Sequence, residues 1–155
     1  ILSESKERRR KTDCIEHVDC SYNKEKILVV EDNELNADIV RMMLERKNLS
    51  VDVVNDGKQA VDRLEKVPED YYSLVLMDIR MPVMDGREAT KIIRSSERED
   101  LKKIPIIAMS ADAFAEEIKI AQSVGMNEYL TKPVRRESLY AMIHLFLQTK
   151  EKLQD

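Results

Sequence analysis

The sequence predicts an α/β fold built on a parallel sheet with helices packed against both of its faces. Short apolar runs without polar alternation recur along the chain, and such runs are typical of strands that are buried on both faces. Each run is followed by a stretch of roughly eleven residues whose apolar positions have helical spacing. Five such strand–helix units in succession favour a doubly wound sheet in which neighbouring strands are parallel.

The five predicted strands lie at residues 26–30, 51–54, 74–77, 104–109 and 128–131. The helices between and after them have their apolar positions at Leu35, Ile39, Met42 and Met43; Ala60, Val61 and Leu64; Ala89, Ile92 and Ile93; Phe114, Ile118 and Ala121; and Leu139, Met142, Ile143 and Phe146. Pro68 ends the second helix and Gly125 the fourth, because Pro cannot continue a helix and Gly readily adopts the left-handed conformation of a helix end. The charged segment 95–103 is predicted to be a loop.

The length of 155 residues suits one domain with a tail. Hydrophobic residues make up 43% of the chain, which is enough for a core. No apolar stretch approaches the ~20 residues of a membrane span, so we expect no membrane contact. Residues 1–24 are charged and aperiodic, which predicts a linker or disordered tail before a folded domain at 25–150 and a short tail at 151–155. Since the first residue is Ile, we expect a fragment of a longer chain.

Charge and cysteine positions disfavour two further classes of function. A net charge of -4 and a pI near 5.4 disfavour direct binding of nucleic acid. Cys14 and Cys20 precede the first strand, so the core needs no disulfide and a reducing, cytoplasmic location is expected. With His17 they recur every third residue, but three ligands do not complete a structural zinc site, which usually has four. A linker remains the preferred interpretation of this segment.

Acidic, hydroxyl and basic side chains stand where four of the predicted strands end. In chain order they are Glu31, Asp32, Asp78, Ser110 and Lys132. The carboxyl ends of parallel strands lie on one edge of a sheet, and open α/β sheets bind their ligands there. If the first, third, fourth and fifth strands are neighbours, these side chains share one pocket.

Three carboxylates in one pocket repel one another unless a cation lies between them. Ligands that are all oxygens favour a hard ion, Mg²⁺ or Mn²⁺, over zinc. A divalent ion, the ammonium group of Lys132 and the hydroxyl of Ser110 together suit a phosphoryl group, whose charge is spread over three oxygens. Asp78 is then the nucleophile that forms an acyl phosphate.

Four segments resemble, in order, the signature regions of the response regulator receiver domain of two-component phosphorelay signalling: VVEDNELN, LVLMDIRMPVMDG, PIIAMSADA and EYLTKPV. The resemblance covers residues 26 to about 150. It implies a flavodoxin-like (βα)5 fold with strand order 2-1-3-4-5. It also implies that the partner is a histidine kinase or a histidine phosphotransfer protein, which supplies the phosphoryl group.

The resemblance gives each position of the pocket a role. Asp78 is the phosphoacceptor, and Lys132 contacts a phosphoryl oxygen. The bond between Lys132 and Pro133 is expected to be cis. The resemblance implies that Mg²⁺ is held by Glu31, Asp32, Asp78 and the backbone carbonyl of Arg80.

Three further positions form the switch that the resemblance implies. Ser110, which stands where Thr is more usual in the family, is the hydroxyl that moves to bond the phosphoryl group. Ala111 follows it in the same phosphate-binding group, and Tyr129 is the aromatic residue that packs inward after phosphorylation. The surface made by the helix around 114–121, the strand 128–131 and the last helix then changes shape. A weak homodimer through this surface is a further expectation.

The motif VEDNELN resembles receivers fused behind hybrid sensor kinases, so the C-terminal receiver of such a kinase is the preferred context. A stand-alone single-domain response regulator is the alternative. Two other classes compete, a pseudo-receiver that only binds a partner and an Asp-nucleophile phosphatase of the haloacid-dehalogenase type. The phosphatase motif has a second Asp two residues after the nucleophile, where this sequence has Arg80. The expectation is therefore a signalling domain that is not an enzyme beyond self-phosphorylation and self-dephosphorylation.

Overall fold

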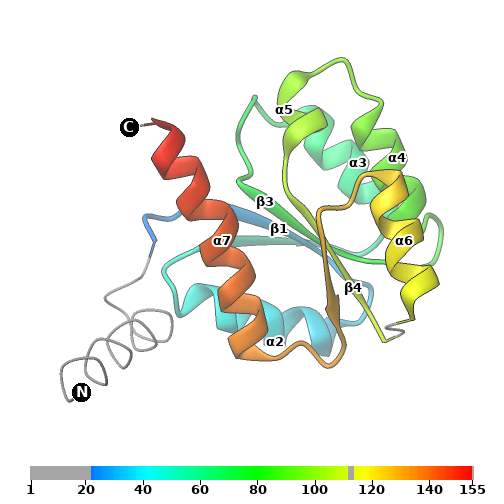
Figure 1. Cartoon of the computed structure of the whole chain (residues 1–155), viewed down its shortest axis with the longest axis horizontal. Coiled ribbons are helices and arrows are strands. Elements are labelled where there is room, and N and C mark those ends of the chain that lie inside the picture. The colour runs from blue at the N-terminus through cyan, green and yellow to red at the C-terminus, as the bar shows by residue number, and fades with distance from the viewer. Residues whose placement is uncertain (1–21, 112–113, 155) are drawn as a thin grey trace.

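The computed structural model describes residues 22–111 and 114–154, with side chains described as far as Leu147 (Figure 1). Its centre is a five-stranded sheet with the order β2-β1-β3-β4-β5, and each neighbouring pair is parallel. The predicted α/β class and the strand order 2-1-3-4-5 are confirmed. The strands are β1 (Lys26–Val30), β2 (Ser50–Val54), β3 (Leu74–Asp78), β4 (Ile106–Ser110) and β5 (Glu128–Thr131).

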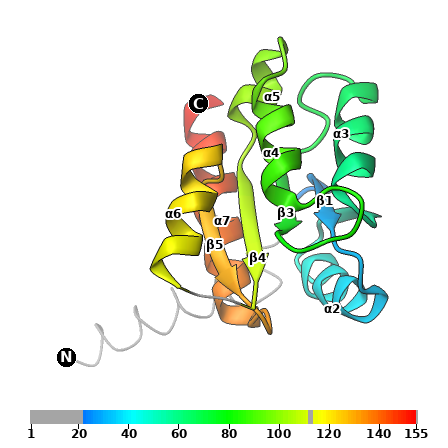
Figure 2. The same ribbon diagram turned by 90° about the vertical axis from the view of Figure 1, so that its right-hand side faces the viewer.

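Helices alternate with the strands and cover both faces of the sheet (Figures 1 and 2). They are α2 (Glu34–Glu45), α3 (Gly57–Lys66), α4 (Gly86–Arg94), α5 (Glu99–Lys103), α6 (Ala115–Val124) and α7 (Arg136–Gln154). One hydrophobic core lies beneath α2 and α7, and a second lies beneath α3, α4, α5 and α6. Among the described residues, no helix is both long enough and apolar enough to cross a membrane.

The unbroken apolar runs form the buried strands, as the sequence predicts. β3 and β4 are buried along their whole length, and β1 is buried at every position after Lys26. β2 and β5 are the edge strands and are partly exposed. The fourth strand begins at Ile106, two residues later than predicted, after Pro105. Buried strands in the middle of a parallel sheet require apolar residues on both faces, which explains why these runs do not alternate.

The predicted apolar face of α2 is wrong at three of its four positions. Leu35, Ile39 and Met42 are exposed by 69%, 43% and 59%. The residues of α2 that are buried are Ala37, Val40 and Leu44. Because this helix has apolar residues on two faces, helical spacing alone does not decide which face packs inward. Two further predicted core positions, Phe114 at the start of α6 and Ile92 of α4, are exposed by 69% and 37%.

The predicted helix ends are confirmed. α3 ends with Val67 as its cap, directly before Pro68. Gly125 ends α6 with a φ of 109°, in the left-handed region that favours glycine. A Cβ at this position would also lie 2.8 Å from Cγ of Arg94. Gly125 therefore allows both the turn and the close approach of α4.

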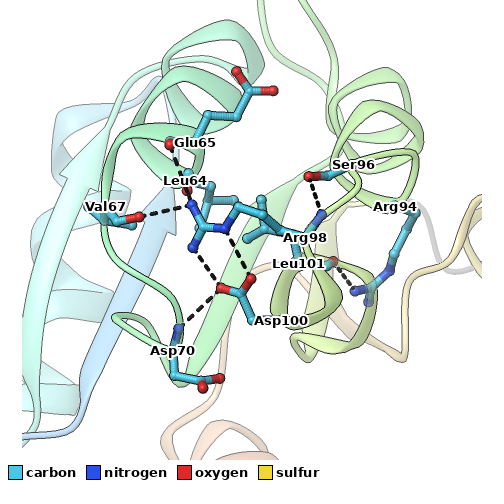
Figure 3. Close-up of polar contacts among 9 residues, drawn as sticks. All are labelled: Leu64, Glu65, Val67, Asp70, Arg94, Ser96, Arg98, Asp100 and Leu101. Atoms are coloured by element: carbon cyan, nitrogen blue, oxygen red, sulfur yellow. Dashed lines mark hydrogen bonds and ion pairs between the residues drawn. The ribbon is translucent and has the colours of Figure 1, made fainter.

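The sequence predicts a loop at 95–103, but the short helix α5 forms within this segment. Arg98 fixes this helix through contacts with a distant part of the chain (Figure 3). Its guanidinium donates hydrogen bonds to the carbonyl oxygens of Leu64 and Val67 at the end of α3, at 3.0 and 2.9 Å. It also donates two to the carboxylate of Asp100, at 3.1 and 2.8 Å. The two carbonyl partners lie 34 and 31 positions away in sequence, so a local pattern could not predict the helix.

Arg94 of α4 connects α5 with the loop between α6 and β5 at the same end of the molecule. Its guanidinium donates hydrogen bonds to the carbonyl oxygens of Gly125 and Leu101 and to Oδ1 of Asn127, at 3.0, 2.9 and 2.9 Å. Asn127 Oδ1 also accepts a hydrogen bond from the amide of Ile106 at the start of β4. We call the edge of the sheet where the strands begin the amino edge, and the edge where they end the carboxyl edge. Arg94 and Arg98 hold the helices in place at the amino edge.

Candidate functional site

The carboxyl edge of the sheet brings together the side chains of Glu31, Asp78 and Lys132. β1 and β3 are neighbours, with Val30 opposite Met77, so the residue after β1 lies beside the last residue of β3. Lys132 follows β5, and its Nζ lies 2.8 Å from Oε2 of Glu31 and 2.9 Å from Oδ2 of Asp78. Residues that are 54 positions apart in sequence therefore form a direct ion pair.

Asp32 completes a group of three carboxylates. One oxygen from each of Glu31, Asp32 and Asp78 lies within 4.8 Å of the others. Glu31 and Asp78 are buried and Asp32 is exposed, so the group faces solvent on one side. Among the described side chains, those of residues 22–111 and 114–147, no other cluster of three His, Cys, Asp or Glu has this geometry. A donor set made only of carboxylate oxygens fits Mg²⁺ or Mn²⁺ better than zinc.

Backbone amides fix the orientation of the two buried carboxylates. The amide of Asn33 donates a hydrogen bond to Oε1 of Glu31, and the amide of Arg80 donates one to Oδ1 of Asp78, both at 3.2 Å. The second oxygen of each carboxylate contacts Lys132. Both carboxylates are therefore held with one oxygen toward the backbone and the other toward the shared ammonium group.

The charges of this cluster do not balance. Burial raises the pKa of Glu31, and the nearby Asp78 adds to this shift, although the hydrogen bond from Lys132 opposes it. Burial alone would lower the pKa of Lys132, but its contacts with Glu31 and Asp78 outweigh burial and raise it. Three carboxylates share one ammonium group, so the cluster has an excess of negative charge that a divalent cation would neutralise.

The loop after β3 is built to pass close to Asp78. The amide of Gly86, at the start of α4, donates a hydrogen bond to the carbonyl oxygen of Ile79 at 2.8 Å. A Cβ at Gly86 would lie 2.3 Å from the carbonyl oxygen of Asp78, so any larger residue would displace the backbone beside the site. Val83 in this loop has a φ of 68°, which a β-branched residue seldom adopts. Strained backbone of this kind is often found at functional sites.

The structure places Ser110 at the same edge as Asp78. Ser110 is the last residue of β4 and is 3% exposed, and Asp78 lies opposite its neighbour Met109 in the β3–β4 pair. Its carbonyl oxygen accepts a hydrogen bond from the amide of Lys132 at 2.8 Å. Ala111 follows it and is exposed. The switch role of Ser110 and the phosphate-binding role of Ala111 stay predictions.

Tyr129 and Arg80 lie around this centre. Tyr129 of β5 is partly buried and packs against the core beneath α3, α4, α5 and α6. The side chain of Arg80 is exposed, and its backbone amide is the group that contacts Asp78. The switch role of Tyr129 and the metal-binding role of the Arg80 carbonyl stay predictions. The bond between Lys132 and Pro133 is cis, as expected.

A comparison with protein families decides the family of the chain. Residues 27–144 match the model of the response regulator receiver domain. The chain belongs to this family. Its five-stranded parallel sheet is the flavodoxin-like fold expected of a receiver, and its domain is a signalling domain of two-component systems.

Relatives of this receiver domain are histidine kinases. The chain is 38% identical to the peroxide stress-activated histidine kinase mak1 of Schizosaccharomyces pombe over 118 residues. The match covers 76% of this chain and 7% of that protein. It is also 38% identical to the sensor protein GacS of Pseudomonas syringae pv. syringae over 119 residues. That match covers 76% of this chain and 13% of GacS. The chain thus spans only a small part of these relatives.

Solved receiver domains have the same fold. The receiver domain of the sensor histidine kinase PA1611 of Pseudomonas aeruginosa matches with a TM-score of 0.72 and 37% identity, over 80% of this chain and 98% of that chain. That crystal structure has a magnesium ion coordinated in the active site cleft. A second match is a chain of the co-crystal structure of the Saccharomyces cerevisiae phosphotransfer protein Ypd1 with the receiver domain of Ssk1. It has a TM-score of 0.72 and 30% identity, and the match covers 81% of this chain and 90% of that chain.

An apolar surface beside the site is the feature that the sequence did not reveal. Leu35, Ile39 and Met42 are spaced on one face of α2 and exposed, and we call them the α2 patch. A cleft of about 330 Å³ joins this helix to the carboxyl edge and is lined by Glu31, Asn36, Ile39, Val40, Met109, Lys132, Pro133 and Val134. The spacing of the α2 patch was visible in the sequence, but it predicted a core face.

Proposed function

We propose that this receiver domain accepts a phosphoryl group on Asp78 from a phosphohistidine, in a Mg²⁺-dependent reaction. The observation that carries the proposal is the convergence of Glu31, Asp32, Asp78 and Lys132 at one edge of the sheet. The magnesium ion in the active site cleft of the related PA1611 receiver supports the choice of metal. Mn²⁺ would fit the same oxygen donors.

The transfer is a displacement at phosphorus. An oxygen of the Asp78 carboxylate attacks the phosphorus, an O–P bond forms, and the P–N bond to the imidazole of the donor breaks. The imidazole nitrogen keeps the electron pair of that bond and takes up a proton. The ammonium of Lys132, already 2.9 Å from Oδ2 of Asp78, compensates the charge of the incoming phosphoryl oxygens.

Mg²⁺ supplies further neutralisation of the phosphoryl charge when it is bound. Glu31, Asp32, Asp78 and the backbone carbonyl of Arg80 would hold it. Lys132 alone cannot balance three carboxylates, so the same residues that bind the ion also need it. This shared requirement predicts that phosphorylation depends on a divalent cation.

The phosphorylated site is proposed to act as a switch for a distant surface. Ser110, Ala111 and Lys132 respond to the new phosphoryl oxygens, and the Ser110 carbonyl already accepts a hydrogen bond from the Lys132 amide. Tyr129 then repacks, and the surface of α6, β5 and α7 changes shape. A cleft of about 250 Å³ at this surface is lined by Tyr129 and Met142 among others, which gives the aromatic ring room to move. A weak homodimer would use the same surface.

The phosphoryl donor is proposed to dock on the α2 patch. A donor must bring its phosphohistidine to the carboxyl edge, and therefore covers the surface next to Asp78. Leu35, Ile39 and Met42 offer that donor an apolar surface, and exposed apolar patches often mark protein interfaces. The co-crystal of Ypd1 with the Ssk1 receiver supports a histidine phosphotransfer protein as one kind of partner.

We infer that the chain is the receiver of a hybrid histidine kinase. Support comes from the relatives, which are histidine kinases much longer than this chain. A stand-alone single-domain regulator is the alternative. In either context we expect a cytoplasmic domain that contacts neither nucleic acid nor membrane, with no enzymatic activity beyond phosphorylating and dephosphorylating itself.

Incubation with acetyl phosphate, followed by intact mass measurement, tests the proposal. The chain is expected to gain one phosphoryl group in the presence of Mg²⁺ and not in its absence. Asp78→Asn should gain none, whereas Asp62→Asn, which removes an exposed carboxylate of α3, should behave as the wild type. Rapid turnover of acetyl phosphate would instead indicate a phosphatase, and a wild-type chain that gains no mass would indicate a pseudo-receiver.

A further inference from the structure

A further groove lies at the amino edge, away from the phosphorylation site. It has a volume of about 800 Å³ and lies between α5, the starts of β3, β4 and β5, and α7. Apolar side chains form much of its lining, among them Ile104, Pro105, Leu145 and Phe146. Leu145 is 53% exposed, so its apolar side chain is available to a ligand in the groove. The proposed phosphorylation reaction makes no use of this surface.

The rim of the groove is acidic. Its lining has the ammonium group of Lys103 and five carboxylates, those of Glu69, Asp70, Glu99, Asp100 and Glu128. Two of these carboxylates already have a cation beside them, Asp100 that of Arg98 and Glu99 that of Lys102. Arg98 and the amide of Asp70 hold the carboxylate of Asp100 in place (Figure 3). Glu69, Asp70 and Glu128 are exposed, so their charges remain available to a ligand. The groove therefore combines an apolar floor with a rim that presents exposed negative charges.

This combination fits side chains that are apolar along their length and positively charged at the tip. Arg and Lys lay their aliphatic stems on apolar surface while their charged groups reach outward. The sequence has a single run of four consecutive cations, Arg8–Lys11, in the segment that precedes the domain. Its charge is complementary to the rim of the groove.

The run is close enough along the chain to reach the groove. The described chain begins at Tyr22 and enters the sheet at Lys26, whose carbonyl accepts a hydrogen bond from the amide of Ser73 in the groove lining. The chain therefore enters at the same edge that carries the groove. Lys11 is eleven positions before Tyr22, and that length of chain spans up to roughly 36 Å when extended.

We propose that Arg8–Lys11 binds in the acid-rimmed groove and fastens the segment before the domain to the amino edge. The contact is intramolecular, so the tether supplies an effective concentration in the millimolar range and a weak interaction suffices. The charged tips lie on the exposed carboxylates, and the stems cover Leu145 and Phe146. Because the carboxylates are at the surface, salt weakens the contact.

The two cysteines of the chain provide a direct test. In a Cys20→Ser variant of the full chain, a nitroxide on Cys14 lies three residues from Lys11. We expect the amide resonances of Ile104, Glu128 and Leu145 to lose most of their intensity by paramagnetic relaxation. Amides at the carboxyl edge, such as that of Asp85, should lose far less. A NaCl concentration of about 1 M, where the Debye length is about 3 Å, should abolish the difference.

Charge reversal gives the matched controls. Arg8→Glu with Arg9→Glu and Arg10→Glu should remove the effect, whereas Arg135→Glu with Arg136→Glu, at exposed positions before and within α7, should leave it unchanged. When Glu69, Glu99 and Glu128 are also changed to Lys, the chain with the charge-reversed segment should again show the broadening at the amino edge. Equal broadening at both edges, no broadening, or broadening that survives charge reversal of the segment would overturn the proposal. Broadening found only between labelled and isotope-enriched chains would assign the groove to a second copy instead.

Discussion

The two edges of the sheet both have clusters of charged side chains, but the clusters are built in opposite ways. At the amino edge, Arg98 donates two hydrogen bonds to the carboxylate of Asp100, and it also donates hydrogen bonds to backbone carbonyl oxygens. At the carboxyl edge, the single ammonium of Lys132 serves the buried carboxylates of Glu31 and Asp78, with Asp32 close by. The charges of the Arg98–Asp100 cluster are balanced, whereas the cluster around Lys132 has an excess of negative charge.

This difference separates a structural cluster from a functional one better than burial does. Asp100 and Asp78 are both largely buried and both contact a cation. The Arg98–Asp100 pair is balanced, whereas the buried cluster at the carboxyl edge has more carboxylates than Lys132 can neutralise, so of these two clusters only the latter needs a metal ion to complete it. Variants at the two edges should therefore differ in their response to Mg²⁺.

The largest effect is expected from Lys132→Met, which leaves Glu31 and Asp78 side by side without their cation. We expect a loss of about 3 kcal/mol in the free energy of unfolding without metal, measured by urea denaturation. Mg²⁺ should restore part of this loss because it binds only the folded site. The exposed cation of Arg135 serves as control, and Arg135→Met should change the stability by less than about 0.5 kcal/mol. Unchanged stability of Lys132→Met without metal would show that the carboxylates do not depend on the ammonium group.

At the amino edge, Arg98→Ala is expected to cost about 2 kcal/mol, because it leaves the Asp100 carboxylate and carbonyl oxygens of α3 without their donor. Arg98→Lys should recover only part of this, since an ammonium group cannot form the paired hydrogen bonds of a guanidinium. Urea denaturation with and without Mg²⁺ measures both. In contrast to Lys132→Met, neither loss should depend on Mg²⁺, and a Mg²⁺-dependent loss would remove the distinction between the edges.

Asp32→Asn is expected to weaken Mg²⁺ binding at least tenfold, or about 1.4 kcal/mol, in isothermal titration calorimetry. Asp32 is the exposed member of the carboxylate group, so its removal lowers the repulsion without leaving a buried cavity. The stability of the metal-free protein should therefore not fall. Asp62→Asn, on the exposed face of α3, is the control. Wild-type affinity in Asp32→Asn would place the ion elsewhere.

The smallest effect concerns the hydroxyl of Tyr72, which donates a hydrogen bond to Asp52 at 2.7 Å. Burial, and then this hydrogen bond, raise the pKa of Tyr72 from 10.0 to about 12. Because the folded-state pKa is raised, the hydroxyl stabilises the fold fully below pH 10 and loses this effect as the pH rises toward 12. Tyr72→Phe should therefore lower stability near neutral pH and flatten its decline above pH 10. Parallel stability curves of wild type and variant across this range would contradict the assignment.

The fold was largely predictable because its three central strands are buried on both faces. Runs such as 26–30 and 74–77 are too short for a typical helix and suit buried strands, and the parallel direction follows from the helices between them. The packing face of α2 was not predictable, because the helix has two apolar faces and only tertiary contact selects one. The helix α5 was missed for the same reason, since Arg98 fixes it through the carbonyl oxygens of α3.

The centre of the site was predictable because the ends of parallel strands share one edge. That rule alone brings Glu31, Asp78 and Lys132 together once the strand order is known. It says nothing of the α2 patch, whose Leu35 and Met42 look like core residues until α2 is placed on the sheet. The segment with Cys14 and Cys20 lies outside the described residues, so the linker prediction there stays a prediction.

The central claim is that the carboxylates and the ammonium at the carboxyl edge form a single site for a divalent ion and a phosphoryl group. A titration with beryllofluoride, an analogue of the phosphoryl group on a carboxylate, tests this most directly when followed by amide resonances with and without Mg²⁺. We predict binding that requires Mg²⁺, shifts the resonances of Ser110, Tyr129 and Lys132, and is absent in Asp78→Asn. Equal binding by Asp78→Asn, or binding by the wild type without a divalent ion, would contradict the account.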